Sequence, residues 1–87
     1  MTEALSTQSL IEIEQRCARA TAGPWKSYVE GRDHTSGDSF IMTGGEDIYL
    51  AGASAEDRDF IANARQDVPT LIAEIRRLQE FIRAGAR

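Results

Sequence analysis

The residues best suited to chemistry gather around one long polar segment, Gly31-Arg32-Asp33-His34-Thr35-Ser36-Gly37-Asp38, and a helical stretch further along the chain. Together they supply two guanidinium forks, two aromatic faces and several hydroxyl, amide and imidazole groups. Forks bind phosphates, rings stack on bases, and amides and hydroxyls recognise polar edges. This inventory predicts a nucleotide-binding site, with Tyr28, Ser39, Arg58 and Gln66 as further polar residues around it. The predicted ligand-binding residues are Trp25, Arg32, His34, Thr35, Ser36, Phe60, Asn63 and Arg65.

Each of these residues also has a purely structural explanation. A lone tryptophan such as Trp25 commonly belongs to the core. Asn63 can bond a nearby loop carbonyl, and the arginines can form solvated faces with weak ion pairs. His34 can be a hydrogen-bonding turn residue rather than a base. The sequence leaves the two explanations open.

Catalytic and metal-binding signatures are absent from the sequence. The phosphate-binding pattern GxxxxGK[ST], the dinucleotide fingerprint GxGxxG and the nucleophile elbow GxSxG do not occur. Residues 33–38 lack the alternating acids of a calcium loop. One cysteine, Cys17, and one histidine cannot form a structural zinc site alone. We therefore expect no enzyme activity, no catalytic residues, no cofactor and no metal.

Hydrophobic periodicity predicts an N-terminal helix within residues 1–23. Ser9 and Glu12 make a capping-box pair at its start, although a start one turn earlier, near Ser6 or Thr7, fits equally. Glycine and proline at 23–24 end it. Residues 24–52 then alternate with period two in three runs, at 25–30, 40–43 and 48–51. These runs predict a three-stranded antiparallel β-meander.

Two further helices are expected in residues 53–87. Ser54 and Asp57 cap one that runs to about Gln66. Proline at 69 is acceptable only in a first helical turn, so a break at about Asp67 and a separate last helix are predicted. That helix carries an apolar seam with spacings of three and four, at Val68, Leu71, Ile75, Leu78 and Ile82.

Length and charge describe one small α+β domain over residues 1–87. A chain of 87 residues has little core, so we favour a homo-oligomer through the last helix over packing of its seam within the chain. A net charge of −4 gives no attraction to DNA, RNA or an anionic membrane. No apolar run is long enough to span a bilayer, and the start lacks a signal-peptide pattern. We expect a cytoplasmic protein.

Two short segments carry a family resemblance. Ala20-Thr21-Ala22-Gly23-Pro24-Trp25 resembles the "ATPGPW" motif of small phage and prophage proteins called Ea22-like. Their "FIAxAR" motif, which a leucine-rich helix follows, resembles Asp59-Phe60-Ile61-Ala62-Asn63-Ala64-Arg65-Gln66-Asp67-Val68-Pro69 with Leu71-Ile72. Ala22 stands where that motif has proline. The layout is also similar to the first Thoeris anti-defence family, oligomeric phage sponges that sequester cyclic ADP-ribose signals and cyclic oligonucleotides. No binding residue carries over from that second similarity.

The resemblance implies a phage-type anti-defence protein in the cytoplasm of a bacterial host. Such a protein binds and sequesters a nucleotide-derived immune signal, a cyclic ADP-ribose isomer or a cyclic oligonucleotide, without turnover. Two alternatives stay open. One is a protein–protein interaction module that acts on a host protein through the C-terminal helix, and the other is a small nucleotide hydrolase with His34 as general base.

Overall fold

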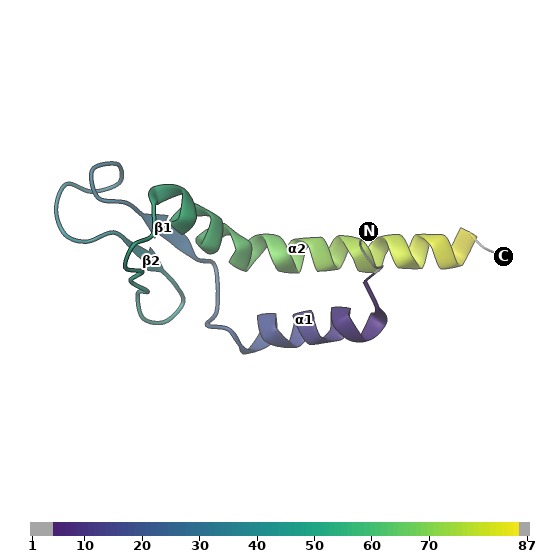
Figure 1. Cartoon of the computed structure of the whole chain (residues 1–87). Helices are drawn as coiled ribbons and strands as arrows, with labels where there is room; N and C mark the ends of the chain where they lie inside the picture. The colour runs from purple at the N-terminus through teal and green to yellow at the C-terminus, as the bar shows by residue number, and fades with distance from the viewer. Residues whose placement is uncertain (1–4, 86–87) are drawn as a thin grey trace. The chain divides into compact units, whose positions relative to one another are not determined.

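The computed structural model describes residues 5–85 and contains two helices and a two-stranded sheet (Figure 1). The elements follow the order α1 (Thr7–Arg19), β1 (Lys26–Tyr28), β2 (Phe40–Met42) and α2 (Ala55–Gly85). They form two compact units. The first comprises the described residues up to Ala20 and from Val68 onward, and the second comprises Thr21–Asp67. None of the helices within residues 5–85 is long and apolar enough to cross a membrane.

The first unit contains α1 and the second half of α2. The Ser6 side chain caps α1, with its Oγ accepting a hydrogen bond of 3.0 Å from the Ser9 amide. Of the two helix starts that the sequence allowed, the earlier one is therefore confirmed, and Ser9 lies inside the helix. Arg76 of α2 forms an ion pair of 2.5 Å with Glu14 of α1.

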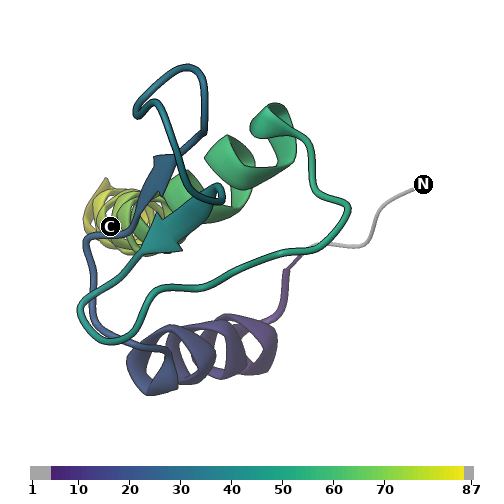
Figure 2. The ribbon, with the colours of Figure 1, turned by 90° about the vertical axis from the view of Figure 1, so that its left-hand side faces the viewer.

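The second unit is built around the antiparallel pair β1 and β2, with Ser27 opposite Ile41. Figure 2 shows the two strands side by side, with the long loop between them extending beyond their ends. The Ile41 side chain is completely buried. Strand β1 is short because the backbone turns at once: the Val29 carbonyl accepts hydrogen bonds from the Arg32 and Asp33 amides.

The predicted third strand does not form. Ile48 pairs with Ile41 through two backbone hydrogen bonds of 2.9 Å, and this bridge is isolated. The Leu50 carbonyl, which a longer strand would present to β2, instead accepts from Arg58 Nη2 at 3.1 Å. Gly52 then turns the chain with a φ of +78°. The prediction of a three-stranded meander is therefore wrong, because a helical arginine holds the segment away from the sheet.

The predicted break between two C-terminal helices is also wrong. Helix α2 runs through Pro69 as one 31-residue helix. Proline at this position removes the amide that would bond the Arg65 carbonyl, and interior proline costs about 3 kcal/mol. Long helical stretches on both sides keep the backbone helical across this single missing bond. The predicted capping box is confirmed: Ser54 Oγ accepts from the Asp57 amide at 3.0 Å, and Asp57 accepts from the Ser54 amide at 3.2 Å.

The chain is thus a mixed α+β protein whose second unit depends on one central side chain. We expect Ile41→Ala to lower the free energy of unfolding by about 2–5 kcal/mol, because it leaves a cavity at a fully buried position. Met42→Ala, at the neighbouring position whose side chain is 40% exposed, is the matched control. Urea unfolding of both variants measures the difference. Equal losses would contradict a core centred on Ile41.

Candidate functional site

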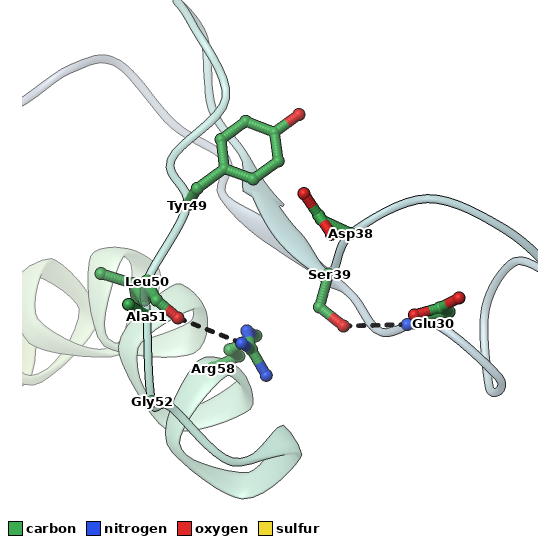
Figure 3. Close-up of a pocket in the computed structure, with 8 residues that line it drawn as sticks. All are labelled: Glu30, Asp38, Ser39, Tyr49, Leu50, Ala51, Gly52 and Arg58. Atoms are coloured by element: carbon green, nitrogen blue, oxygen red, sulfur yellow. Dashed lines mark hydrogen bonds between the residues drawn. The ribbon is translucent and has the colours of Figure 1, made fainter.

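A polar hollow of about 490 Å³ lies in the second unit (Figure 3). The side chains of Glu30, Asp38, Ser39, Tyr49 and Arg58 line it, together with residues 50–52. They come from the end of β1, the approach to β2, the segment after the Ile48 bridge, and the first turns of α2. A site in this place draws on four separate stretches of the chain, all within the second unit.

Arg58 provides the hollow's positive charge. Its Nη2 donates to the Leu50 carbonyl, which fixes the direction of the guanidinium. Its Nε is buried and has no hydrogen-bond partner among the described residues. A buried donor without a partner costs about 1–3 kcal/mol. In Figure 3 the Arg58 guanidinium lies between the Leu50 carbonyl and the Ser39 side chain. Because this Nε is buried, an acceptor in the hollow reaches it only if the Arg58 side chain shifts.

Glu30 and Asp38 provide two negative charges. The Glu30 amide donates to Ser39 Oγ at 3.0 Å, which ties the end of β1 to the approach to β2. A carboxylate is an acceptor only, so each of these side chains can receive hydroxyl or amino donors from a ligand. The Ser39 hydroxyl accepts the Glu30 amide and keeps its own proton to donate. The hollow therefore offers donors and acceptors together.

Tyr49 adds an aromatic face and belongs to a cluster of rings centred on Phe40. Phe40 stacks on Tyr28, its cross-strand partner, with ring centroids 5.2 Å apart. The Tyr49 and His34 rings tilt against Phe40, each with centroids 5.9 Å away. Phe40 thus supports Tyr49 from behind, while 59% of Tyr49 stays exposed. A supported, exposed ring is a suitable surface for stacking a base.

Arg32, one of the two predicted phosphate ligands, is occupied by acids of its own chain. Its guanidinium donates to both carboxylate oxygens of Asp59, at 2.8 and 3.0 Å, and to Asp33 Oδ2 at 2.9 Å. Ser27 Oγ also donates to Asp59, at 2.7 Å. The hydrogen bonds from Arg32, followed by that from Ser27, lower the pKa of Asp59 to about 2. A phosphate at Arg32 would have to displace two carboxylates.

Trp25 and Arg65 support the backbone. Trp25 Nε1 donates to the Thr21 and Ala22 carbonyls, at 3.0 and 3.2 Å. Arg65 Nε donates to the same Thr21 carbonyl at 2.9 Å. Gln66 receives the Trp25 amide at 2.6 Å and donates to the Trp25 carbonyl at 3.2 Å. These contacts hold the segment before β1 on α2, at a place that does not line the polar hollow.

The remaining predicted residues are dispersed. His34 Nδ1 lies 2.7 Å from the Ser36 carbonyl, and His34 Nε2 is buried without a partner among the described residues. Thr35 is exposed in the loop. Asn63 donates to the Asp59 carbonyl one turn back at 2.8 Å. Phe60 is 75% exposed and lines a second, more apolar hollow of about 510 Å³ that shares residues 50–52. The eight predicted residues therefore do not converge on one hollow.

Sequence reasoning gave no role to Glu30, Asp38 and Tyr49, which line the hollow, and included Arg58 and Ser39 only in the wider polar set. A signal for Tyr49 was present: it is an aromatic residue at an outward position of an alternating run. Glu30 and Asp38 bracket the long polar loop. Only the pairing of β1 with β2 brings these two loop ends together.

Comparisons with known proteins yield no relatives: no family model, no curated protein and no solved structure matches this chain. Residues 5–85 also contain no group of three or more histidine, cysteine or acidic side chains arranged to hold a metal ion. The function must therefore be argued from the geometry of the hollow.

The Arg32–Asp59 contact makes a pH-dependent prediction. The pKa of Asp59 is depressed from about 3.9 in an unfolded chain to about 2, so its contribution to stability is complete above about pH 5. That contribution disappears as the pH falls toward 2. Asp59→Asn should therefore have a lower melting temperature than the wild type at pH 6, and the difference should narrow as the pH falls from about 5 to about 2.

Thermal unfolding followed by circular dichroism at several pH values tests this expectation. Asp47→Asn is the control, because the exposed Asp47 carboxylate makes no ion pair with the described residues. If the difference in melting temperature between Asp59→Asn and the wild type stays constant from pH 6 to pH 2, that result would contradict a stabilising Arg32–Asp59 ion pair.

Proposed function

We propose that this chain binds a nucleotide-derived signal in the polar hollow beside Tyr49 and holds it without converting it. The ligand class is a cyclic ADP-ribose isomer or a cyclic oligonucleotide. The setting is the cytoplasm of a bacterial host, where a phage-type protein would sequester an immune signal. The observation that carries the proposal is the buried, unpartnered Nε–H of Arg58 in a hollow rimmed by a supported aromatic ring.

The hollow has a complementary group for each part of a nucleotide. The base stacks on the exposed face of Tyr49, which Phe40 supports. A phosphate oxygen accepts from Arg58, as guanidinium groups commonly bind phosphate. Sugar hydroxyls or base amino groups donate to Glu30 and Asp38, because these carboxylates can only accept. A volume of about 490 Å³ lies within the usual range of small-ligand sites.

For each phosphate group, the charge of the hollow favours a phosphodiester over a terminal phosphate. The hollow contains one cation, Arg58, and two carboxylates, Glu30 and Asp38. Each additional negative charge on the ligand is repelled by those carboxylates. A phosphodiester carries one negative charge per phosphate, whereas a terminal monoester carries between one and two at neutral pH. At the phosphate bound by Arg58, the charge of the hollow therefore favours a diester over a terminal monoester.

Binding without turnover agrees with the side chains around the hollow. Neither His34 nor Cys17 lines it. His34 bonds the Ser36 carbonyl and contacts Phe40 instead. Among the described lining residues, Ser39 Oγ accepts from the Glu30 amide and has no hydrogen bond to a side-chain base that would activate it as a nucleophile.

A ligand panel provides the direct test. The purified chain is melted alone and with cyclic ADP-ribose isomers, cyclic di- and trinucleotides, and linear mononucleotides. Ligand at about 100 times its dissociation constant adds about 2.7 kcal/mol, which raises the melting temperature of a domain this size by roughly 10–20 °C. We expect this shift with a cyclic compound, recovered chemically unchanged. No shift with any compound, or recovery of a cleaved product, would contradict the proposal.

Two matched pairs of variants locate the bound ligand. Arg58→Ala and Tyr49→Ala remove the two groups that we assign to phosphate and base. Loss of a base–aromatic stack costs about 1–3 kcal/mol, so Tyr49→Ala should weaken binding by roughly 5- to 150-fold. Arg65→Ala and Phe60→Ala remove an arginine and an aromatic residue that do not line the polar hollow, and they should leave affinity within about twofold. Calorimetric titration measures all four.

The opposite result for the four variants would contradict binding in the hollow, but it would leave the proposal of nucleotide binding itself in place. If Arg65→Ala and Phe60→Ala weaken binding and the hollow variants do not, the ligand lies at residues that the sequence singled out. Because Arg58 also bonds Leu50, Arg58→Lys serves as a second variant that keeps the charge but lacks the Nε–H.

A further inference from the structure

Asp38 contributes a carboxylate to the polar hollow. Within residues 5–85 no hydrogen bond or ion pair involves this side chain, whereas both acids at Arg32 are paired. Asp38 lies two residues before Phe40, the residue whose ring contacts Tyr49. In Figure 3 the Asp38 carboxylate points from the approach to β2 toward the Tyr49 ring. A group that stacks on Tyr49 therefore has an available acceptor beside it.

Glu30, the other acid of the hollow, is placed differently. Its side chain also has no hydrogen-bond or ion-pair partner in the described part of the chain. Its amide donates to Ser39 Oγ, and in Figure 3 Glu30 lies on the far side of Ser39 from Tyr49. Of the two acids, Asp38 is thus the one beside the aromatic face. Glu30 carries the same charge in the same hollow and so provides a matched control.

A carboxylate distinguishes the bases because it can only accept hydrogen bonds. Its two oxygens receive two donors side by side, in a charge-assisted pair. Guanine presents two such neighbouring donors on one edge, the N1–H and the N2 amino group. Adenine and cytosine place an acceptor nitrogen beside their amino group, and uracil and thymine place a carbonyl oxygen on each side of one N–H. A carboxylate therefore forms two hydrogen bonds with guanine and at most one with any other base.

Stacking on Tyr49 leaves the edge of a base free for this recognition. The Tyr49 side chain is 59% exposed, and Phe40 contacts it from the other side. A base stacked on the exposed face lies parallel to the ring, so the donors and acceptors of the base project sideways in its own plane. Asp38 lines the same hollow as Tyr49 and is on the page the acid that points toward this plane.

A ribose hydroxyl is the other kind of donor that Asp38 can receive from a nucleotide. A hydroxyl brings one proton to the carboxylate, whereas guanine brings two at the spacing of the two oxygens. A hydrogen bond to ribose is also the same for every base. The relative affinity for different bases therefore separates the two kinds of contact.

We propose that Asp38 recognises the base stacked on Tyr49 and makes the hollow selective for guanine. One carboxylate oxygen accepts from the guanine N1–H and the other from the N2 amino group. This inference rests on the function proposed above. It narrows the ligand class to a guanine-containing cyclic oligonucleotide, since the base of a cyclic ADP-ribose isomer is adenine.

Calorimetric titration of the full chain with three cyclic dinucleotides tests the selectivity. The probes are cyclic di-GMP, cyclic di-AMP and the inosine analogue cyclic di-IMP, which share one phosphodiester ring and differ only in their bases. A bidentate pair discriminates against the wrong base by roughly 5- to 150-fold, so cyclic di-GMP should bind tighter than cyclic di-AMP by that factor. Cyclic di-IMP keeps the N1–H but lacks the amino group, and its affinity should fall between the other two.

Asp38→Asn and Glu30→Gln locate the group that selects the base. Each substitution removes one negative charge from the hollow, which changes the affinity for all three anionic ligands alike. The ratio of affinities for cyclic di-GMP and cyclic di-AMP cancels that common effect. Asp38→Asn should bring the ratio to within about threefold of one, because an amide offers one acceptor and one donor group in place of two acceptors. Glu30→Gln should keep the wild-type ratio.

The outcomes separate this inference from the function on which it rests. Equal binding of cyclic di-GMP and cyclic di-AMP, or tighter binding of cyclic di-AMP, would overturn the guanine assignment and leave nucleotide binding in place. A wild-type ratio in Asp38→Asn, or a lost ratio in Glu30→Gln, would overturn the role of Asp38. If neither these probes nor any other cyclic nucleotide binds, the proposed function and this inference are both wrong.

Discussion

The hydrogen bond from Arg58 to the Leu50 carbonyl decides how the second unit is built. It engages the backbone group that a third strand would need, and so limits the sheet to β1 and β2. Arg58 lines the hollow together with Tyr49, Ser39 and Glu30, and its Nε is buried without a partner among the described residues. If a third strand used the Leu50 carbonyl, Arg58 Nη2 would lose this hydrogen-bond acceptor. The hollow and the short sheet are therefore two consequences of one contact.

Local sequence signals predicted part of the fold correctly. The helix cap at Ser54 and Asp57, the alternative start near Ser6, and the strands around Ser27 and Ile41 all follow from capping chemistry and period-two alternation. The two errors arose where a tertiary contact or helix length outweighed a local preference. Alternation at 48–51 cannot reveal that Arg58 takes the Leu50 carbonyl. Pro69 signals a break, yet long helical flanks carry α2 through it.

The candidate site was harder to predict because a residue type does not show which partners it finds. Arg32 has the fork that phosphate binding requires, but Asp59 and Asp33 already occupy it. Arg65 and Trp25 meet at the Thr21 carbonyl and hold the backbone. Arg58 has the same side chain as these arginines and keeps a donor free. Only the folded arrangement shows which partners each of these guanidinium groups finds.

Within the second unit, the residues that stabilise and the residues that face the hollow are largely different. Ile41 fills the core and Asp59 ties the loop at Arg32 to α2, whereas Tyr49 stands out from the sheet with Phe40 behind it. Substitutions of the residues that face the hollow can thus change ligand binding while the hairpin of β1 and β2 stays intact.

The most direct measurement is an NMR titration of the ¹⁵N-labelled chain that follows the Arg58 Nε–H resonance while a cyclic nucleotide is added. The account predicts a large downfield shift of that resonance, saturable and accompanied by changes in the amides of residues 49–52. An Arg58 resonance that stays in place while residues 32–36 or 60–65 respond would contradict the central claim that the free donor of Arg58 is where the ligand binds.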